Sequence, residues 1–109
     1  MPSAQGIREE HWKEFETKMR DHVIRESRQS YGWPCTIFEA MINKLGVKEA
    51  VHRVLTKDAP TEGVLSGPWR EHRLDLTLEY WVNNDRFRWM FSKIEIESAR
   101  WRLKNAANL

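Results

Sequence analysis

Hydrophobic positions recur every three or four residues along most of the chain, which is the spacing of an amphipathic helix. The longest such pattern covers residues 7–29, where charged Glu, Lys and Arg side chains occupy most of the other positions. Six side chains form its predicted stripe: Trp12, Phe15, Met19, His22, Val23 and Glu26. The pattern predicts one long helix that ends near Gly32, because glycine readily adopts the left-handed backbone that follows a helix.

Two shorter helices are predicted next, with Gly46 between them. Pro34 suits the first position of the earlier helix, because proline lacks an N–H and its φ is already helical. The apolar face of that helix contains Phe38, Met41, Ile42 and Leu45. The apolar face of the later helix contains Val47, Ala50, Val51, Val54 and Leu55. This helix should end before residues 57–60. Residues 61–69, with two glycines and a proline, should form a connection, with one helical turn at most.

Residues 72–81, HRLDLTLEYW, carry two competing patterns. Three leucines alternate with polar residues, as they would in a half-buried strand. Leu78, Trp81 and Val82, in contrast, continue at helical spacing. No second strand pattern exists in the sequence to pair with the first, and one strand cannot form a sheet. We therefore expect a helix here.

Five side chains are predicted to organise the starts of the C-terminal helices. Asp75 is expected to be an N-cap, with Glu79 one turn later beside the positive end of the helix dipole. Asp85 is expected to cap a short helix that continues through residue 91. Ser92 and Glu95 have the spacing of a capping box, which starts a last helix that reaches about residue 105. The residues expected to be buried in that helix are Ile96, Ala99 and Leu103.

These elements predict an all-α fold: a compact single-domain bundle of five or six helices, with a long N-terminal helix, over residues 1–109. Cys35 is the one cysteine, so no internal disulfide forms and a reducing compartment is expected. No apolar run approaches the roughly 18 residues of a membrane span, and the polar N-terminus has no secretory pattern. We therefore expect a cytoplasmic protein that does not bind membranes.

The motif RLDLTLE at 73–79, followed by AR-x-RL at 99–103, resembles a pattern of uncharacterised small bacterial helical proteins. The resemblance covers residues 31–104, the family-like core, and leaves the N-terminal helix of residues 1–30 outside it. It implies a helical core and brings no activity, cofactor or catalytic residue.

Candidate catalytic chemistry is sparse in the sequence. Asp75 and Glu79 have the i,i+4 spacing that an acid–base pair or a metal site uses, but a cap and a helix-dipole partner, with Arg73 or a neighbouring basic residue as salt-bridge partner, explain the same spacing. Cys35 and His52 are a conceivable nucleophile and base, and a helix start lowers a thiol pKa, but no third member accompanies them. The four histidines stand singly, so no zinc-binding spacing exists. We expect no enzyme activity, no cofactor and no metal.

The C-terminal third combines basic and aromatic residues. Residues 86–109 contain six basic and two acidic residues, a net charge of +4. The predicted partner-binding residues are Arg86, Arg88, Trp89, Arg100, Trp101, Arg102 and Lys104. Arginine and tryptophan dominate the energetics of many protein interfaces, and a chain with six tryptophans cannot easily bury them all.

The function favoured by these features is a non-catalytic interaction module that binds a protein partner, or itself as a homodimer, through this Trp/Arg surface. One alternative is nucleic-acid binding by the same surface, since bases and aromatic side chains interleave there. A helix-turn-helix over residues 37–55 would be another route to DNA, although such helix pairs are also common packing units. A further alternative is a small accessory or inhibitory protein of a phage or bacterial defence system.

Overall fold

The structure is a computed structural model that describes residues 4–56 and 65–108 of the 109-residue chain. Every regular element of these residues is helical, and no strand occurs among them. The predicted all-α fold is confirmed, and the described residues form six α-helices if the N-terminal helix is counted once. Residues 57–60, before which the second short helix is predicted to end, and residues 61–64 of the predicted connection lie outside the described residues.

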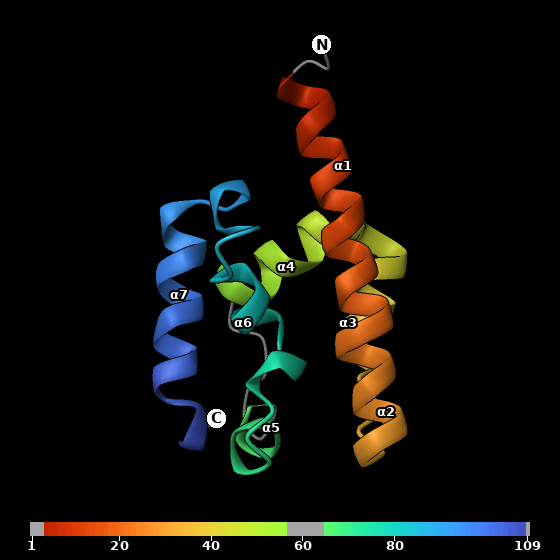
Figure 1. Ribbon diagram of the computed structural model, residues 1–109, viewed down its shortest axis with the longest axis vertical. Coiled ribbons are helices and arrows are strands. Elements are labelled where there is room, and N and C mark those ends of the chain that lie inside the picture. Colours follow the sequence, from red (N-terminus) through yellow and green to blue (C-terminus); the bar gives the residue numbers. More distant parts are fainter. Residues whose placement is uncertain (1–3, 57–64, 109) are drawn as a thin grey trace. The chain divides into compact units, whose positions relative to one another are not determined.

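The N-terminal helix consists of α1 (Ala4–Thr17), a π-helical segment η1 (Lys18–Ile24) and α2 (Arg25–Tyr31). The other α-helices are α3 (Thr36–Leu45), α4 (Val47–Thr56), α5 (Ser66–Arg70), α6 (Leu78–Val82) and α7 (Lys93–Lys104). The short 3-10 segments are η2 (Leu74–Leu76), η3 (Arg88–Met90) and η4 (Ala106–Asn108). Figure 1 shows this order along the chain.

The predicted long N-terminal helix is confirmed, and its π-helical segment is a feature that the sequence pattern missed. A π-helix makes i→i+5 hydrogen bonds, so each turn contains more residues than in an α-helix. The buried stripe of the N-terminal helix is therefore displaced by one position after η1: Ser27 is buried, whereas Glu26, the predicted member of the stripe, is half-exposed. Phe15, Met19 and Val23 are buried as predicted.

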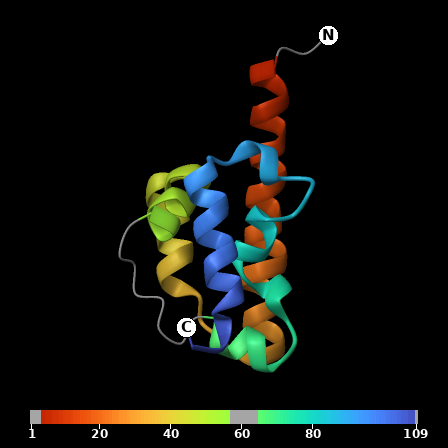
Figure 2. The same cartoon turned by 90° about the vertical axis from the view of Figure 1, so that its left-hand side faces the viewer.

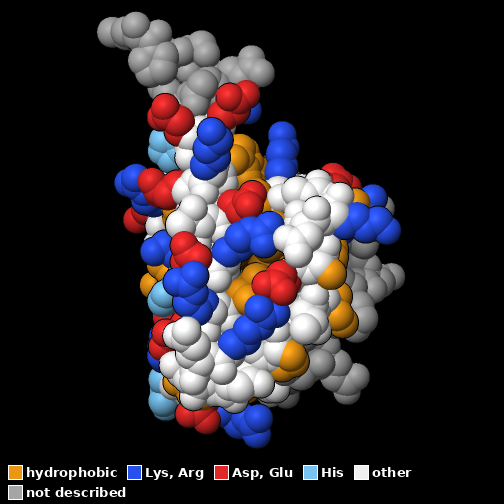
Figure 3. Space-filling model, turned by 90° about the vertical axis from the view of Figure 1, so that its right-hand side faces the viewer, with side chains coloured by type: hydrophobic (Ala, Val, Ile, Leu, Met, Phe, Trp, Pro, Cys, Tyr) orange, Lys and Arg blue, Asp and Glu red, His pale blue; other side chains and the backbone are white. Residues whose placement is uncertain are grey.

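The exposed side of the N-terminal helix carries acidic and basic side chains intermixed, as Figure 3 shows. Glu16 pairs with Arg20 at 3.0 Å and Asp21 with Arg25 at 3.2 Å, both at i,i+4 spacing. Exposed pairs of this kind stabilise a helix by only about 0.3–0.5 kcal/mol each. This face is therefore a solvated, charge-balanced surface.

The N-terminal helix ends at Gly32, as predicted, and the next helix starts later than predicted. Gly32 has a left-handed φ of 69°, and the N–H groups of Gly32 and Trp33 donate to the carbonyls of Arg28 and Ser27. Pro34 is not a first helical residue, because α3 begins two positions later at Thr36. The Pro34 carbonyl instead accepts a 2.7 Å hydrogen bond from Arg28 Nε, which fixes the connection.

The chain divides into two compact units, unit 1 (residues 1–50) and unit 2 (residues 51–109). The division falls inside α4, whose residues belong to both units. The single domain over residues 1–109, and the division at residues 30 and 31 that the resemblance implied, stay predictions. We describe each unit by itself.

Unit 2 is built around the contact between α6 and α7, which lie side by side in Figures 1 and 2. The helical turn of α5 contacts both η2 and η4. The larger fully buried side chains of unit 2 include Leu65, Val82 and Phe87. Because α7 has one side against this core, its other side faces solvent, and that side is the starting point for the functional site.

Candidate interaction surface

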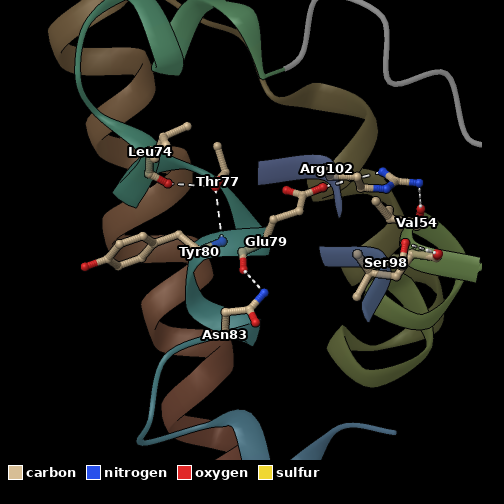
Figure 4. Close-up of polar contacts among 9 residues, drawn as sticks. Val54, Leu74, Thr77, Glu79, Tyr80, Asn83, Ser98 and Arg102 are labelled. Atoms are coloured by element: carbon tan, nitrogen blue, oxygen red, sulfur yellow. Dashed lines mark hydrogen bonds and ion pairs between the residues drawn. The ribbon is translucent and has the colours of Figure 1, made fainter. Parts of the chain in front are cut away.

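The stretch that combined strand and helix patterns forms a 3-10 turn followed by the short helix α6, and its N-cap is Thr77. The Thr77 hydroxyl accepts a hydrogen bond from the Tyr80 N–H at 3.2 Å and donates to the Leu74 carbonyl at 2.7 Å, as shown in Figure 4. The predicted N-cap role of Asp75 is wrong, because Asp75 lies in η2, before the helix. One hydroxyl thus connects η2 to α6.

Asp75 and Glu79 pair with different arginines. Both carboxylate oxygens of Asp75 accept from Arg73, at 3.0 and 3.1 Å, and the Asp75 carbonyl accepts from the Trp81 indole at 2.7 Å. Of the predicted salt-bridge partners, Arg73 or a neighbouring basic residue, the structure shows Arg73. Glu79 lies in the first turn of α6, as predicted, but its side chain is buried against Arg102.

Arg102 is buried, contrary to its predicted place on the partner-binding surface. Its side chain joins three helices of unit 2: Nη1 lies 3.5 Å from Glu79 Oε2, and Nη2 donates to the Val54 carbonyl at 2.5 Å. Figure 4 shows Arg102 between these two partners. Burial raises the pKa of Glu79, while a backbone hydrogen bond to its carboxylate and, after that, the positive charge and hydrogen bond of Arg102 oppose that shift. Arg102 and Glu79 therefore have a structural role.

The C-terminal carbonyls of α4 are satisfied by side chains of α7. A helix leaves its last carbonyl groups without partners inside the helix. Arg102 donates to the Val54 carbonyl, and the Ser98 hydroxyl donates to the Leu55 carbonyl at 2.7 Å. His52 Nδ1 lies 3.3 Å from Glu95 Oε2, which adds a third polar contact between the two helices. These contacts fix the inner side of α7.

The start of α7 is the predicted capping box. The Ser92 hydroxyl accepts from the Glu95 N–H at 3.2 Å, and Glu95 Oε1 accepts from the Ser92 N–H at 2.8 Å. Of the residues expected to be buried in this helix, Ala99 is buried, while Ile96 and Leu103 are half-buried. The capping box and the buried residues set the rotation of α7 about its axis.

The solvent side of α7 is a continuous stripe that we call the α7 face. It consists of the exposed residues of the helix: Lys93, Ile94, Glu97, Arg100, Trp101 and Lys104. Ile94 is 67% exposed and Trp101 is 60% exposed, and their i,i+7 spacing places them on the same side of the helix, two turns apart. Two large apolar side chains therefore face water between charged residues.

Asn83 connects two of the predicted surface arginines. Its side-chain oxygen accepts from Arg100 Nε at 3.1 Å, and its backbone carbonyl accepts from Arg88 Nη2 at 2.6 Å. Arg88 also pairs with Asp85 at 3.1 Å. The predicted cap at Asp85 is wrong: the next short helix begins after Phe87 without a side-chain cap. Asn83 thus places Arg88 beside the edge of the α7 face.

The remaining predicted surface residues are Arg86, Trp89 and Lys104, and all three are exposed. The Trp89 indole donates to the Arg86 carbonyl at 3.0 Å, which keeps the ring at the turn between α6 and α7. The structure therefore places six of the seven predicted residues at least partly at the surface and buries Arg102.

Cys35 does not have the lowered thiol pKa that its place at a helix start predicted. It has the N-cap position of α3, with a left-handed φ of 51°. Burial raises the pKa of the thiol, and this outweighs the hydrogen bond from Ser27 and the charge of Arg28. The Arg28 guanidinium donates two hydrogen bonds, of 2.9 and 3.0 Å, to the Glu39 carboxylate.

Sequence reasoning missed Ile94 as part of the surface and Arg102 as part of the core. The signal for Arg102 was present, because Ala99, Arg102 and Ala106 follow helical spacing and all three are buried. Arg102 was nevertheless assigned to the surface because its side chain is basic. Ile94 carried no comparable signal, because its exposure depends on how α7 is rotated.

Comparisons with known proteins supply no identity. No protein-family model matches the chain, and no curated protein or solved structure is significantly similar to it. The resemblance to a bacterial family and the role in a defence system therefore stay predictions. Across residues 4–56 and 65–108, no three His, Cys, Asp or Glu side chains gather to hold a metal ion. No helix of the described ranges is long and apolar enough to cross a bilayer.

Proposed function

We propose that this chain is a non-catalytic interaction module that binds a protein through the α7 face. The observation that supports the proposal is the exposure of Ile94 and Trp101 on one side of α7, with Arg100 and Lys104 beside them. Isolated exposed apolar residues are ordinary, but here a tryptophan is aligned with an isoleucine beside an arginine, and tryptophan and arginine are enriched in protein-binding hot spots.

A protein partner fits this surface better than a nucleic acid. Arg102, counted among the cations of the predicted surface, is buried against Glu79, and Arg88 is paired with Asp85. The α7 face also carries Glu97, whose carboxylate would repel a phosphate backbone. These pairings lower the number of cations available for phosphate contacts, whereas the apolar pair remains exposed.

The structural roles of Asp75 and Glu79 support a non-catalytic function. Asp75 is held by Arg73 and Glu79 by Arg102, so the two carboxylates serve different salt bridges. An acid–base pair requires two groups that reach the same substrate. We place the protein in the cytoplasm, as the single cysteine suggests.

The proposal is tested by photocrosslinking at the α7 face. Trp101 is replaced by photoreactive benzoylphenylalanine in the full chain, which keeps an aromatic ring at this position, and the cells that naturally contain the protein are irradiated. We expect a discrete protein adduct. The matched control carries the same residue in place of Trp69, which is 47% exposed and lies in α5.

The control separates binding from simple exposure. An adduct at position 101 that is absent at position 69, and that weakens when Arg100→Glu is added, supports the proposal. Equal adducts at both positions, adducts that nuclease removes, or no adduct at position 101 would each contradict it.

A further inference from the structure

The α7 face carries more positive than negative charge. Its charged side chains are three basic residues and one acidic residue, a net charge of +2: Lys93, Arg100, Lys104 and Glu97. On the inner side of the helix, Arg102 is paired with the buried Glu79, so these two charges cancel. The Glu95 carboxylate is largely buried there and lies 3.3 Å from His52 Nδ1. A partner therefore meets a basic surface.

Arg100 is held in place without losing its charge. Its Nε donates to the side-chain oxygen of Asn83 at 3.1 Å, and this acceptor is an uncharged amide. The turn beside the face adds one further positive charge, because Arg86 and Arg88 are accompanied there by Asp85 alone. An oriented guanidinium is well suited to a carboxylate, whose two oxygens match its planar N–H donors.

Each exposed apolar side chain of the α7 face has a basic neighbour. Ile94 directly follows Lys93, while Trp101 directly follows Arg100 and precedes Lys104 by one turn. The two apolar residues are two turns apart, which is about 10 Å along the helix axis. A partner that covers both must present two apolar groups at this separation, with negative charge beside each of them.

We propose that the partner of the α7 face is an acidic peptide segment of a different protein, with two apolar side chains about 10 Å apart and Asp or Glu residues beside them. This inference rests on the proposed function and names the chemistry of the partner. The apolar side chains of the segment cover Ile94 and Trp101. Its carboxylates pair at the rim with Lys93, Arg100 and Lys104, where complementary charge directs association and specificity.

An acidic peptide fits this face better than a second copy of the chain or a nucleic acid. Two copies of the face would bring six basic and two acidic side chains together, and like charges in contact are unfavourable. A nucleic acid carries a negative charge at every nucleotide, so it also brings phosphate against Glu97. In a peptide, the residue opposite Glu97 can be uncharged.

Mass spectrometry of the adduct at position 101 identifies the segment that covers the face. The full chain with benzoylphenylalanine in place of Trp101 is irradiated in the cells that naturally contain it, and the crosslinked peptide is sequenced after proteolysis. We expect a segment of a different protein. Over a stretch as long as α7, this segment should have a net negative charge and contain apolar residues.

Charge variants test the sign of the complementarity. Lys93→Glu with Lys104→Glu gives the face a net charge of −2 and should lower the adduct yield by at least about tenfold. Glu97→Gln removes the one carboxylate of the face and should raise the yield. The matched control is Lys44→Glu with Arg70→Glu, at exposed residues of α3 and α5. It changes the charge of the chain equally and should leave the yield unchanged.

The double variant on α7 should remain folded. Lys93 and Lys104 are the first and last residues of α7, so an acidic residue gained at the positive end of the helix dipole offsets the one gained at the negative end. Far-UV circular dichroism checks that each variant is helical. An equal loss of yield in both double variants overturns the inference, as does a lower yield with Glu97→Gln.

The outcomes distinguish this inference from the proposed function. A protein adduct at position 101 whose segment is neutral or basic, or belongs to a second copy of this chain, overturns the acidic-peptide inference and leaves the proposed function standing. An adduct that nuclease removes, or no adduct at all, overturns both.

Discussion

Glu79 and Arg102 show what happens when two charged side chains leave water together. Glu79 is 4% exposed and Arg102 is 9% exposed. Desolvation of each charge is unfavourable, and the attraction between them, together with the hydrogen bond to the Val54 carbonyl, offsets that cost. A pair of this kind specifies how α6, α7 and the end of α4 meet, because any displacement leaves a buried charge without its partner.

Removing Arg102 should therefore destabilise the protein strongly. We expect Arg102→Met, which keeps the apolar stem, to lower the free energy of unfolding by about 3–5 kcal/mol, because Glu79 is left buried without a partner. Chemical denaturation measures this value. The matched control, Arg100→Met on the exposed side of the same helix, should change it by less than about 0.5 kcal/mol. Equal effects of the two variants would show that Arg102 is not buried as described.

The buried carboxyl also predicts a pH dependence. Burial raises the pKa of Glu79 above its usual value of 4.5, so the folded chain binds this proton more tightly than the unfolded chain does. The resulting stability is fully present below about pH 4.5 and is lost as the pH rises through the raised pKa of the folded state. Glu79→Gln keeps a hydrogen-bond acceptor without this titration.

Denaturation of the wild-type chain and of Glu79→Gln from about pH 4 to about pH 8 measures the difference. The stability of the variant relative to the wild type should increase with pH over this range. Other titrating groups are common to both chains and cancel in the comparison. A difference that stays constant with pH would contradict the raised pKa.

At the scale of the element, caps decide where the short helices of unit 2 begin. Thr77 provides the cap of α6 that we assigned to Asp75, and Ser92 provides the cap of α7. Both Asp and Thr are good N-caps, so the sequence alone does not choose between positions 75 and 77. The 3-10 turn of residues 74–76 makes the choice, since it delays the start of the helix.

Thr77→Ala should lower the free energy of unfolding by about 1 kcal/mol, because the Tyr80 N–H and the Leu74 carbonyl each lose a partner. Thermal or chemical denaturation provides the measurement. Thr77→Ser retains the hydroxyl and should restore most of the loss. If the serine variant is as unstable as the alanine variant, packing of the Thr77 methyl group, and not the cap, explains the effect.

At the scale of the whole molecule, the two units share a helix. The division falls within α4, and a helix forms cooperatively because each added residue extends an existing hydrogen-bonded turn. Melting of one half of α4 therefore disfavours the other half. This connection is the physical reason to expect that the chain unfolds as a single domain.

Tryptophan fluorescence tests this expectation with probes in each unit. One variant keeps only Trp33, in unit 1, and another keeps only Trp81, in unit 2, with the other tryptophans changed to phenylalanine. Each variant is also followed by circular dichroism, and within each variant the two signals should give the same denaturant midpoint. A fluorescence midpoint that departs from the circular dichroism midpoint in either variant would show that the units unfold independently.

The sequence by itself determined the helical class, the long N-terminal helix, the stop at Gly32 and the capping box at Ser92. These features depend on residues within about two turns of each other, so local spacing is enough to predict them. Local spacing could not predict the π-helical segment, because the same residues also fit an unbroken α-helix.

Only the tertiary structure decided which charged residues are core and which apolar residues are surface. Arg102 is buried because Glu79, 23 positions earlier in the chain, and the carbonyl of Val54, 48 positions earlier, meet it there. Ile94 and Trp101 are exposed because those same contacts hold the opposite side of α7 against the rest of unit 2. Local spacing cannot reveal a partner so distant in the sequence, and such distant partners determine which side of a helix remains available for binding.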